Sequence, residues 1–214
     1  MNRVGSTYRD IARRLEESAN IQKALAKSNV IIIAEIAECI VTSYKAGGKV
    51  ILFGNGGSAA DAQHLACELV GKFELKRQPF PAIALSSNIS ILTALANDYG
   101  YEAVFSRQLE ALVNERDVVI GISTSGNSPN VVNALELARR KGAQTVALAG
   151  NNGGEIAGVA DLVLTVPSSS TPRIQESHIT IGHIICELVE KELAYPEAEE
   201  EPAGVGWFRT KSQP

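Results

Sequence analysis

The spacing of apolar residues changes once along the chain, close to residue 48. Before that point they recur every three or four positions, the period of an amphipathic helix, at Ile11, Leu15, Ile21, Ala24 and Leu25. A second apolar stretch, 29–44, ends at Gly47 and Gly48, which is typical of a helix terminus. Its β-branched positions 31–33 are compatible with a strand, but the flanking alanines and glutamates favour helix. We therefore expect an N-terminal helical segment over 1–47.

After residue 48, short apolar runs alternate with amphipathic segments. The runs are 49–53 (KVILF), 81–85 (PAIAL), 117–122 (DVVIGI), 145–149 (TVALA) and 162–166 (LVLTV). Helical patterns lie between and after them, near 58–72, 90–113, 129–141, 153–159 and 172–194. Apolar strands separated by helices predict an α/β domain over 48–194, with a five-stranded parallel sheet sandwiched by helices. Right-handed crossovers then gather the strand-to-helix loops at the carboxyl edge, where such folds bind ligands.

Composition narrows the classes of protein that the pattern allows. The net charge of −4 disfavours a nucleic-acid-binding domain, and aromatic residues, at 5%, predict an aliphatic core. We find no apolar run long enough to span a membrane and no signal peptide, so we expect a cytoplasmic protein. The three cysteines form no CxxC pair and predict no disulfide framework. The tail 195–214 is acidic, with proline and glycine, and is expected to be flexible.

The loop GNGGS, at 54–58, follows the first predicted strand. Gly56 and Gly57 allow a ligand to approach the backbone, and Ser58 with Asp61 suggests a capped helix start. The glycine spacing matches neither a dinucleotide fingerprint nor a Walker A loop. A tight turn without a ligand is the alternative interpretation of this loop.

The loop STSGNSP, at 123–129, follows the third predicted strand and carries four hydroxyl groups, those of Ser123, Thr124, Ser125 and Ser128. Ser128 can cap a helix that begins at Pro129. Hydroxyl donors beside a helix N-terminus suit a phosphate, although the loop contains no lysine. A capped turn is the alternative. The similar loop GNNGGE, at 150–155, is interpreted as a turn.

Two helices carry residues suited to acid–base or metal chemistry. His64 and Glu68 are four residues apart and share a helix face. This spacing suits two ligands of one metal ion, a base and its partner, or an exposed His–Glu pair without a function. In the last helix, His183 lies about 80° around the axis from Gln175, and His178 lies about 60° the other way. We favour His183 for the site and interpret His178 as structural. Asn97 and Asp98 precede Tyr99 and Gly100, a turn signal between two helices, and could bind sugar hydroxyls or only shape that turn.

Taken together, four segments resemble the phosphoheptose isomerases of the sugar isomerase (SIS) superfamily. They are GNGGSAADAQHLACELVGKF (54–73), LTALANDYGYEAVFSRQLEAL (92–112), GISTSGNSPNV (121–131) and TPRIQESHITIGHIICELVEKEL (171–193). The resemblance covers about residues 5–194 and implies a flavodoxin/Rossmann-like SIS fold. It also implies a homotetramer with active sites at subunit interfaces and one zinc ion per subunit. The long apolar N-terminal helices agree with oligomerisation, since a single sheet domain would not cover them fully.

The activity that the resemblance implies is the reversible conversion of sedoheptulose 7-phosphate to D-glycero-D-manno-heptose 7-phosphate, which feeds nucleotide-activated heptose for surface glycans. Carried over by position, the zinc ligands would be His64, Glu68, Gln175 and His183. The sugar contacts would be Asn55, Gly56, Gly57, Glu68, Asn97, Asp98 and Gln175, and the phosphate contacts Ser123, Thr124, Ser125 and Ser128. Glu68 is the expected general base and His183 the expected acid, although a tightly bound zinc ligand is a poorer base. Asn88 departs from the acidic residue expected in many relatives and leaves the local sugar contacts open.

Three alternatives share this fold. A non-catalytic tetrameric SIS protein that binds the replication initiator would be expected to lack the helical acid–base set, which is present here. A sensor domain of a transcription regulator would be joined to a helix-turn-helix segment, and none is evident. An isomerase of another sugar phosphate would keep the same chemistry, because specificity depends on the shape of the pocket.

Overall fold

The computed structural model describes residues 3–194, and the predicted tail 195–214 lies outside them. Its five strands are β1 (Val50–Gly54), β2 (Ala82–Ala84), β3 (Val118–Ser123), β4 (Gln144–Gly150) and β5 (Leu162–Val166). The α-helices are α1 (Arg3–Ser28), α2 (Val30–Lys45), α3 (Gly57–Val70), α4 (Ile89–Tyr99), α5 (Ser106–Leu112), α6 (Pro129–Arg140) and α7 (Thr171–Ala194). Two 3₁₀ turns, η1 (Tyr101–Ala103) and η2 (Glu155–Gly158), complete the described elements.

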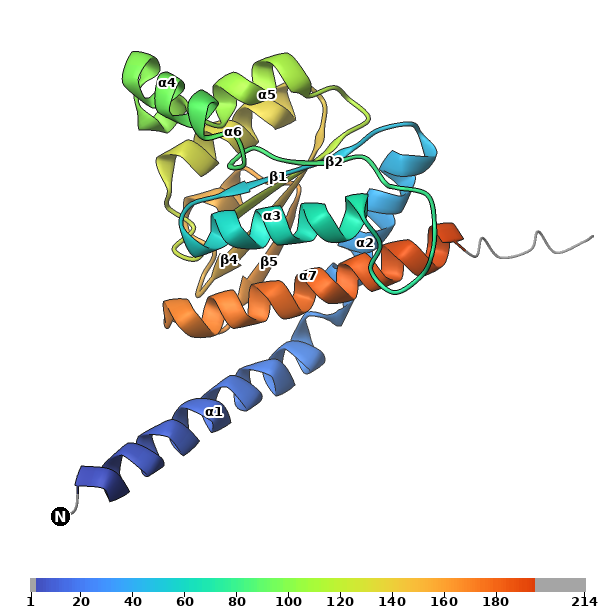
Figure 1. Ribbon diagram of the computed structural model, residues 1–214. Helices are drawn as coiled ribbons and strands as arrows, with labels where there is room; N and C mark the ends of the chain where they lie inside the picture. Colours follow the sequence, from blue (N-terminus) through green and yellow to red (C-terminus); the bar gives the residue numbers. More distant parts are fainter. Residues whose placement is uncertain (1–2, 195–214) are drawn as a thin grey trace, which may run out of the picture.

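The strands form one parallel sheet in the order β2-β1-β3-β4-β5, as the alternating pattern predicts (Figure 1). Leu52 in β1 pairs with Ala84 on one side and with Ile120 on the other. The reversal of strand order places β1 and β3 next to each other, so the two ligand-loop candidates leave the same edge of the sheet from neighbouring strands.

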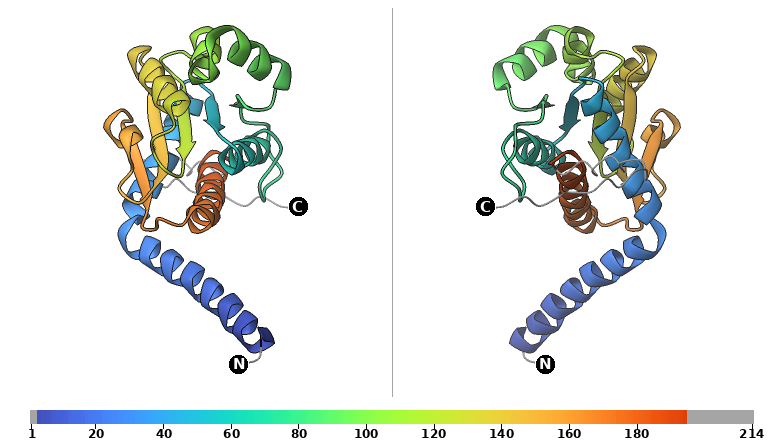
Figure 2. Two further views of the ribbon diagram at one scale, coloured as in Figure 1. Left: turned by 90° about the vertical axis from the view of Figure 1, so that its left-hand side faces the viewer. Right: turned by 90° about the vertical axis from the view of Figure 1, so that its right-hand side faces the viewer.

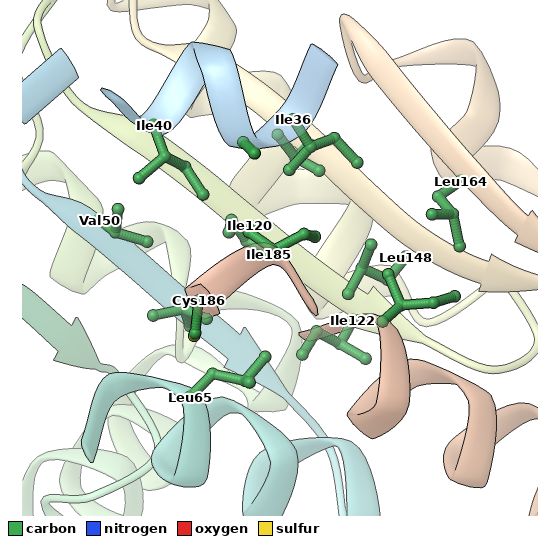
Figure 3. Close-up of a cluster of buried hydrophobic side chains, with 14 of the residues drawn as sticks. Ile36, Ile40, Val50, Leu65, Ile120, Ile122, Leu148, Leu164, Ile185 and Cys186 are labelled. Atoms are coloured by element: carbon green, nitrogen blue, oxygen red, sulfur yellow. The ribbon is translucent and has the colours of Figure 1, made fainter. Parts of the chain in front are cut away.

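Helices cover both faces of the sheet because its strands are apolar on both sides. On one face α2, α3 and α7 pack onto Val50, Leu52 and Ile120, and on the other α5 and α6 pack onto Ile51 and Phe53. Figure 3 shows the first of these two cores. There Ile36 and Ile40 of α2, Leu65 of α3 and Ile185 of α7 converge on the strands. The core is aliphatic, as the composition predicts.

Helix α1 projects from this body, as both views in Figure 2 show. Its later half is anchored to the start of α7, where Ser18 donates to Glu176 (2.9 Å) and Gln22 donates to Ser177 (3.3 Å). Tyr8, Ile11 and Leu15, in its earlier half, are between 53% and 67% exposed. No helix in residues 3–194 is long and apolar enough to cross a membrane.

The predicted strands match the observed ones to within one residue at either end. Two helix predictions are wrong in extent. The segment 90–113 is divided at Gly100, which adopts a left-handed φ of 85° between α4 and η1, at the place of the predicted turn signal. The segment 153–159 contains only the short η2, since Gly153 and Gly154 both have positive φ. Within 1–47, α2 belongs to the sheet-covering layer, and the boundary at residue 47 stays a prediction.

Candidate functional site

The glycine loop after β1 brings backbone and amide groups to the carboxyl edge of the sheet. Gly56 has a φ of 55° and occupies the N-cap position, so α3 begins at Gly57. The predicted cap by Ser58 is therefore wrong: Ser58 already lies within the helix and is buried. Gly56 and Gly57 are exposed, which leaves the backbone of this loop open to a ligand.

Asn55 is held by two residues that the sequence reasoning missed. Its side-chain amide forms a reciprocal pair with that of Asn130, with both N···O distances 2.9 Å, and Tyr101 donates its hydroxyl to Asn55 Oδ1 at 2.9 Å. Asn130 is 2% exposed and lies in the first turn of α6. This pair ties the glycine loop to the helix that follows the serine loop. The sequence signal that could have identified Asn130 is its position two residues after Ser128, at the start of the predicted helix.

The serine loop gathers hydroxyl groups at the start of α6. Ser123 Oγ lies 3.0 Å from Ser128 Oγ and 3.5 Å from Ser125 Oγ. Ser128 occupies the predicted N-cap position and Pro129 the first helical position, but the Ser128 side chain makes no cap hydrogen bond and faces Ser123 instead. Thr124 is half-buried beside them. Val131 and Val132 donate their N–H groups to the Ser128 carbonyl, so the hydroxyl groups and the positive dipole end of α6 are what make this cluster suitable for an anion.

The turn 150–155 supports the serine loop from behind. Gly126 has a φ of 71°, and a Cβ at this position would lie 1.9 Å from the carbonyl oxygen of Gly153. Ile156 donates its N–H to the Gly126 carbonyl at 2.9 Å, and Glu155 donates its N–H to Asn127 Oδ1 at 2.9 Å. The second glycine-rich turn thus fixes the shape of the serine loop, a role that turn chemistry alone did not reveal.

Helices α3 and α7 lie side by side and run in the same direction, with their carboxyl halves further from the glycine loop (Figure 1). A Cβ on Gly57 would lie 2.4 Å from Gln175 Nε2, and a Cβ on Gly182 would lie 2.5 Å from Leu65 Cδ2. Glycine at 57 and 182 therefore allows the two helices and their side chains to approach closely. This register brings the middle of α3 next to the middle of α7.

In that middle region, His64, Glu68 and His183 form a three-residue cluster. Nε2 of His64 lies 2.9 Å from Nε2 of His183 and 3.2 Å from Oε1 of Glu68, and the three donor atoms lie within 4.8 Å of one another. His64 is exposed, whereas Glu68 and His183 are half-buried. A tetrahedral zinc ion bound at about 2.0–2.1 Å would hold two imidazole nitrogens about 3.3 Å apart. The donor set fits a zinc site with three protein ligands.

Gln175 lies apart from this cluster within the chain. It precedes His183 by eight residues, about 12 Å along the helix axis, and its amide contacts the glycine loop at Gly57. Asn97 and Asp98 are exposed in the last turn of α4, where Asn97 donates to Asp98 Oδ1 at 2.8 Å. Neither makes a hydrogen bond to the glycine or serine loop within the part of the chain that the structure describes. Asn88 caps α4 by accepting from the Ile91 N–H at 3.1 Å.

His178 is fully buried, and its Nε2 lies 3.1 Å from the carbonyl oxygen of Ala149. Burial lowers the pKa of His178 to about 4, although the hydrogen bond to Ala149 acts in the opposite direction. The imidazole is therefore neutral at physiological pH and packs between α7 and β4. This environment agrees with the structural interpretation of His178.

Comparison with known protein families shows the class to which this chain belongs. The SIS domain model matches residues 15–150, more than half of the chain, so this is a SIS domain protein. The phosphoheptose isomerase of Citrifermentans bemidjiense is 56% identical over 184 residues, which cover 86% of this chain and 96% of that protein.

Two solved structures agree with the curated relative. Phosphoheptose isomerase GmhA from Neisseria gonorrhoeae is 39% identical, with a TM-score of 0.82, over 86% of this chain and 99% of that one. A phosphoheptose isomerase from Francisella tularensis is 36% identical, with a TM-score of 0.84, over 86% and 98%. The chain belongs to the phosphoheptose isomerase family, which confirms the resemblance inferred from its motifs.

Proposed function

We propose that this chain is an aldose–ketose isomerase that interconverts sedoheptulose 7-phosphate and D-glycero-D-manno-heptose 7-phosphate. The observation that carries the proposal is the meeting of His64, Glu68 and His183 from two helices, whose amino ends lie at the same sheet edge as the glycine and serine loops. Membership of the phosphoheptose isomerase family supports the choice of substrate. The product would supply nucleotide-activated heptose for surface glycans.

The serine loop is the proposed phosphate site. Ser123, Thr124, Ser125 and Ser128 supply neutral hydroxyl donors, and the start of α6 supplies the positive end of a helix dipole. Because no lysine lies in the loop, phosphate affinity depends on the number and direction of these hydrogen bonds.

The sugar is proposed to lie along the glycine loop. Asn55, Gly56 and Gly57 offer amide and backbone groups, and Gln175 contacts the same loop from α7. For Gln175 this position supports a sugar contact, and its predicted role as a fourth zinc ligand gains no support from the geometry of a single chain. The sugar contacts of Asn97 and Asp98 stay predictions.

The proposed chemistry moves a proton between C1 and C2 through an enediol. Glu68 removes a proton from C1 of the ketose, while His183 donates one to the C2 carbonyl oxygen, which gives the enediol. His183 then takes the proton from the C1 hydroxyl, and Glu68 returns its proton to C2, so both residues end as they began. Glu68 directs Oε1 toward His64, which leaves Oε2 as the basic oxygen.

His64, Glu68 and His183 are the proposed holders of one zinc ion per subunit. A zinc ion bound there would polarise the substrate carbonyl and stabilise the developing negative charge on oxygen. A cytoplasmic homotetramer with interface active sites is also proposed. The exposed apolar residues Tyr8, Ile11 and Leu15 on the projecting α1 support association between subunits.

The test is incubation of the purified full chain with sedoheptulose 7-phosphate, with added zinc or with chelator, followed by proton NMR. We expect conversion to an aldoheptose phosphate, and loss of conversion with chelator. Parallel reactions with five- and six-carbon ketose phosphates test the choice of substrate. A folded protein that converts only another sugar phosphate, or none at all, contradicts the proposal.

A further inference from the structure

The connection between α3 and β2, residues 71–81, has no regular secondary structure but is held by one buried carboxylate. Glu190 of α7 is 1% exposed and accepts three successive backbone N–H groups, from Phe73 (2.9 Å), Glu74 (2.7 Å) and Leu75 (2.7 Å). A row of N–H groups around one anion fixes the path of the backbone. Burial alone would raise the pKa of Glu190, but these donors and Arg77 hold it below its ordinary value, so the carboxylate is charged.

Arg77 completes this arrangement and reaches the end of α3. Its Nε donates to Glu190 Oε1 at 2.8 Å, and its guanidinium donates to the carbonyls of Glu68 (2.9 Å) and Leu69 (2.9 Å). The Arg77 side chain is 5% exposed, and its guanidinium carbon lies 3.9 Å from the centre of the Phe80 ring. A cation at a helix C-terminus satisfies carbonyls that have no partner within the helix.

Two contacts connect these residues to the metal-ligand cluster. Phe73 donates its backbone N–H to Glu190, and the centroid of its ring lies 5.6 Å from the centroid of the His183 ring. Arg77 binds the backbone carbonyl of Glu68 itself. Within residues 3–194, neither His64 nor His183 forms a hydrogen bond through its Nδ1, which is the usual means of orienting a metal-binding imidazole. Packing against Phe73 takes that place for His183.

A buried ion pair is weak evidence for stability, because a well-packed apolar pair of the same volume is often as stable. Glu190 and Arg77 fix the direction of several backbone groups at once. An apolar pair could not do this. We propose that Glu190, with Arg77, is a positioning residue that orients His183 through Phe73 and holds the backbone of Glu68. The inference rests on the proposed function and extends it to residues outside the reacting cluster.

The test compares Glu190→Gln with Glu187→Gln in the full chain. Both substitutions remove one carboxylate from α7, but the Glu187 side chain is 38% exposed and, among residues 3–194, pairs only with Lys191. In Glu190→Gln, an amide NH₂ replaces one acceptor oxygen and faces N–H donors. We expect kcat and zinc affinity to fall by about 10-fold to 100-fold, the usual effect of losing a residue that supports metal ligands, with KM little changed. Glu187→Gln is expected to match the wild type in both.

A second variant, Phe73→Leu, keeps the ion pair and removes only the ring beside His183. We expect it to lower kcat and to shift the His183 imidazole signal in NMR spectra of the metal-free protein, with a melting temperature close to that of the wild type. The chain has three histidines, so substitution of each assigns the signals. If Glu190 only stabilises the fold, the His183 imidazole signal of folded Glu190→Gln should match that of the wild type.

Wild-type kcat, zinc affinity and His183 signal in folded Glu190→Gln and Phe73→Leu would overturn the proposal. If Glu190→Gln does not fold, the kcat and zinc affinity of Phe73→Leu decide, because loss of an aromatic ring shifts a neighbouring imidazole signal in any case. If the wild type does not convert sedoheptulose 7-phosphate, the proposed function fails. Zinc affinity and the His183 signal still decide the positioning role in that case.

Discussion

Substitution of Gly57 by alanine separates the role of the glycine loop in activity from its role in the stability of the folded protein. An added Cβ would lie 2.4 Å from Nε2 and 2.9 Å from Cδ of Gln175, whereas ordinary contact begins at 3.4 Å. The amide of Gln175 must therefore retreat by about 1 Å, a misplacement that can cost about 100-fold in rate. The backbone itself accepts alanine, since Gly57 is the first residue of α3 and has no positive φ. Alanine also favours helix over glycine by up to about 1 kcal/mol.

We expect Gly57→Ala to retain or raise the melting temperature while kcat/KM for sedoheptulose 7-phosphate falls by about 100-fold. Gly158→Ala is the matched control, because a Cβ there meets nothing within 4 Å. If the effect passes through Gln175, adding Gly57→Ala to a Gln175→Ala variant causes little further loss. Wild-type kcat/KM in Gly57→Ala would refute the reasoning, and so would a full second loss in the double variant.

Three further predictions concern pH, phosphate and metal. Because the pKa of His178 falls from 6.5 to about 4 on folding, only the unfolded chain binds a proton between these values. Stability should therefore decline by on the order of 3 kcal/mol as pH falls through that window, as urea unfolding would show, and His178→Gln should reduce this slope. Ser128→Ala should weaken competitive inhibition by inorganic phosphate by about 10-fold or more, and an unchanged inhibition constant would exclude Ser128 from the phosphate site. Chelator should lower the melting temperature and zinc restore it, whereas an unaffected melting temperature would argue against binding at His64, Glu68 and His183.

The arrangement of strands could be predicted because each strand is apolar on both faces and each crossover contains a helix. The same pattern placed the glycine and serine loops at one edge of the sheet. The spacing of apolar residues did not show where the segment 90–113 divides into α4 and α5, but the turn signal at Tyr99 and Gly100 marked that place. The cap predicted at Ser58 was wrong because Gly56 turns the chain two residues earlier than a serine cap would.

Within the candidate site, helical spacing paired His64 with Glu68. The angles around the last helix indicated that one of its two histidines shares the site face, and the apolar run around His183 favoured that residue. Spacing along one helix cannot give the register between two helices, which here depends on the contact of Gly182 with Leu65. Asn130 and Tyr101 were missed because their partner, Asn55, is distant in sequence. The separation of Gln175 from His183 follows from the helix rise, which angular position alone does not express.

The most direct test of the proposed chemistry is hydrogen exchange at C1 of sedoheptulose 7-phosphate in heavy water, with the wild type and with Glu68→Gln. For the wild type we expect deuterium at C1, and at C2 of the aldose product. In Glu68→Gln we expect exchange to fall by about 100-fold or more, the usual contribution of a general base. Exchange at the wild-type rate in folded Glu68→Gln would contradict the assignment of the base, and conversion without exchange by the wild type would contradict the proton transfer through an enediol.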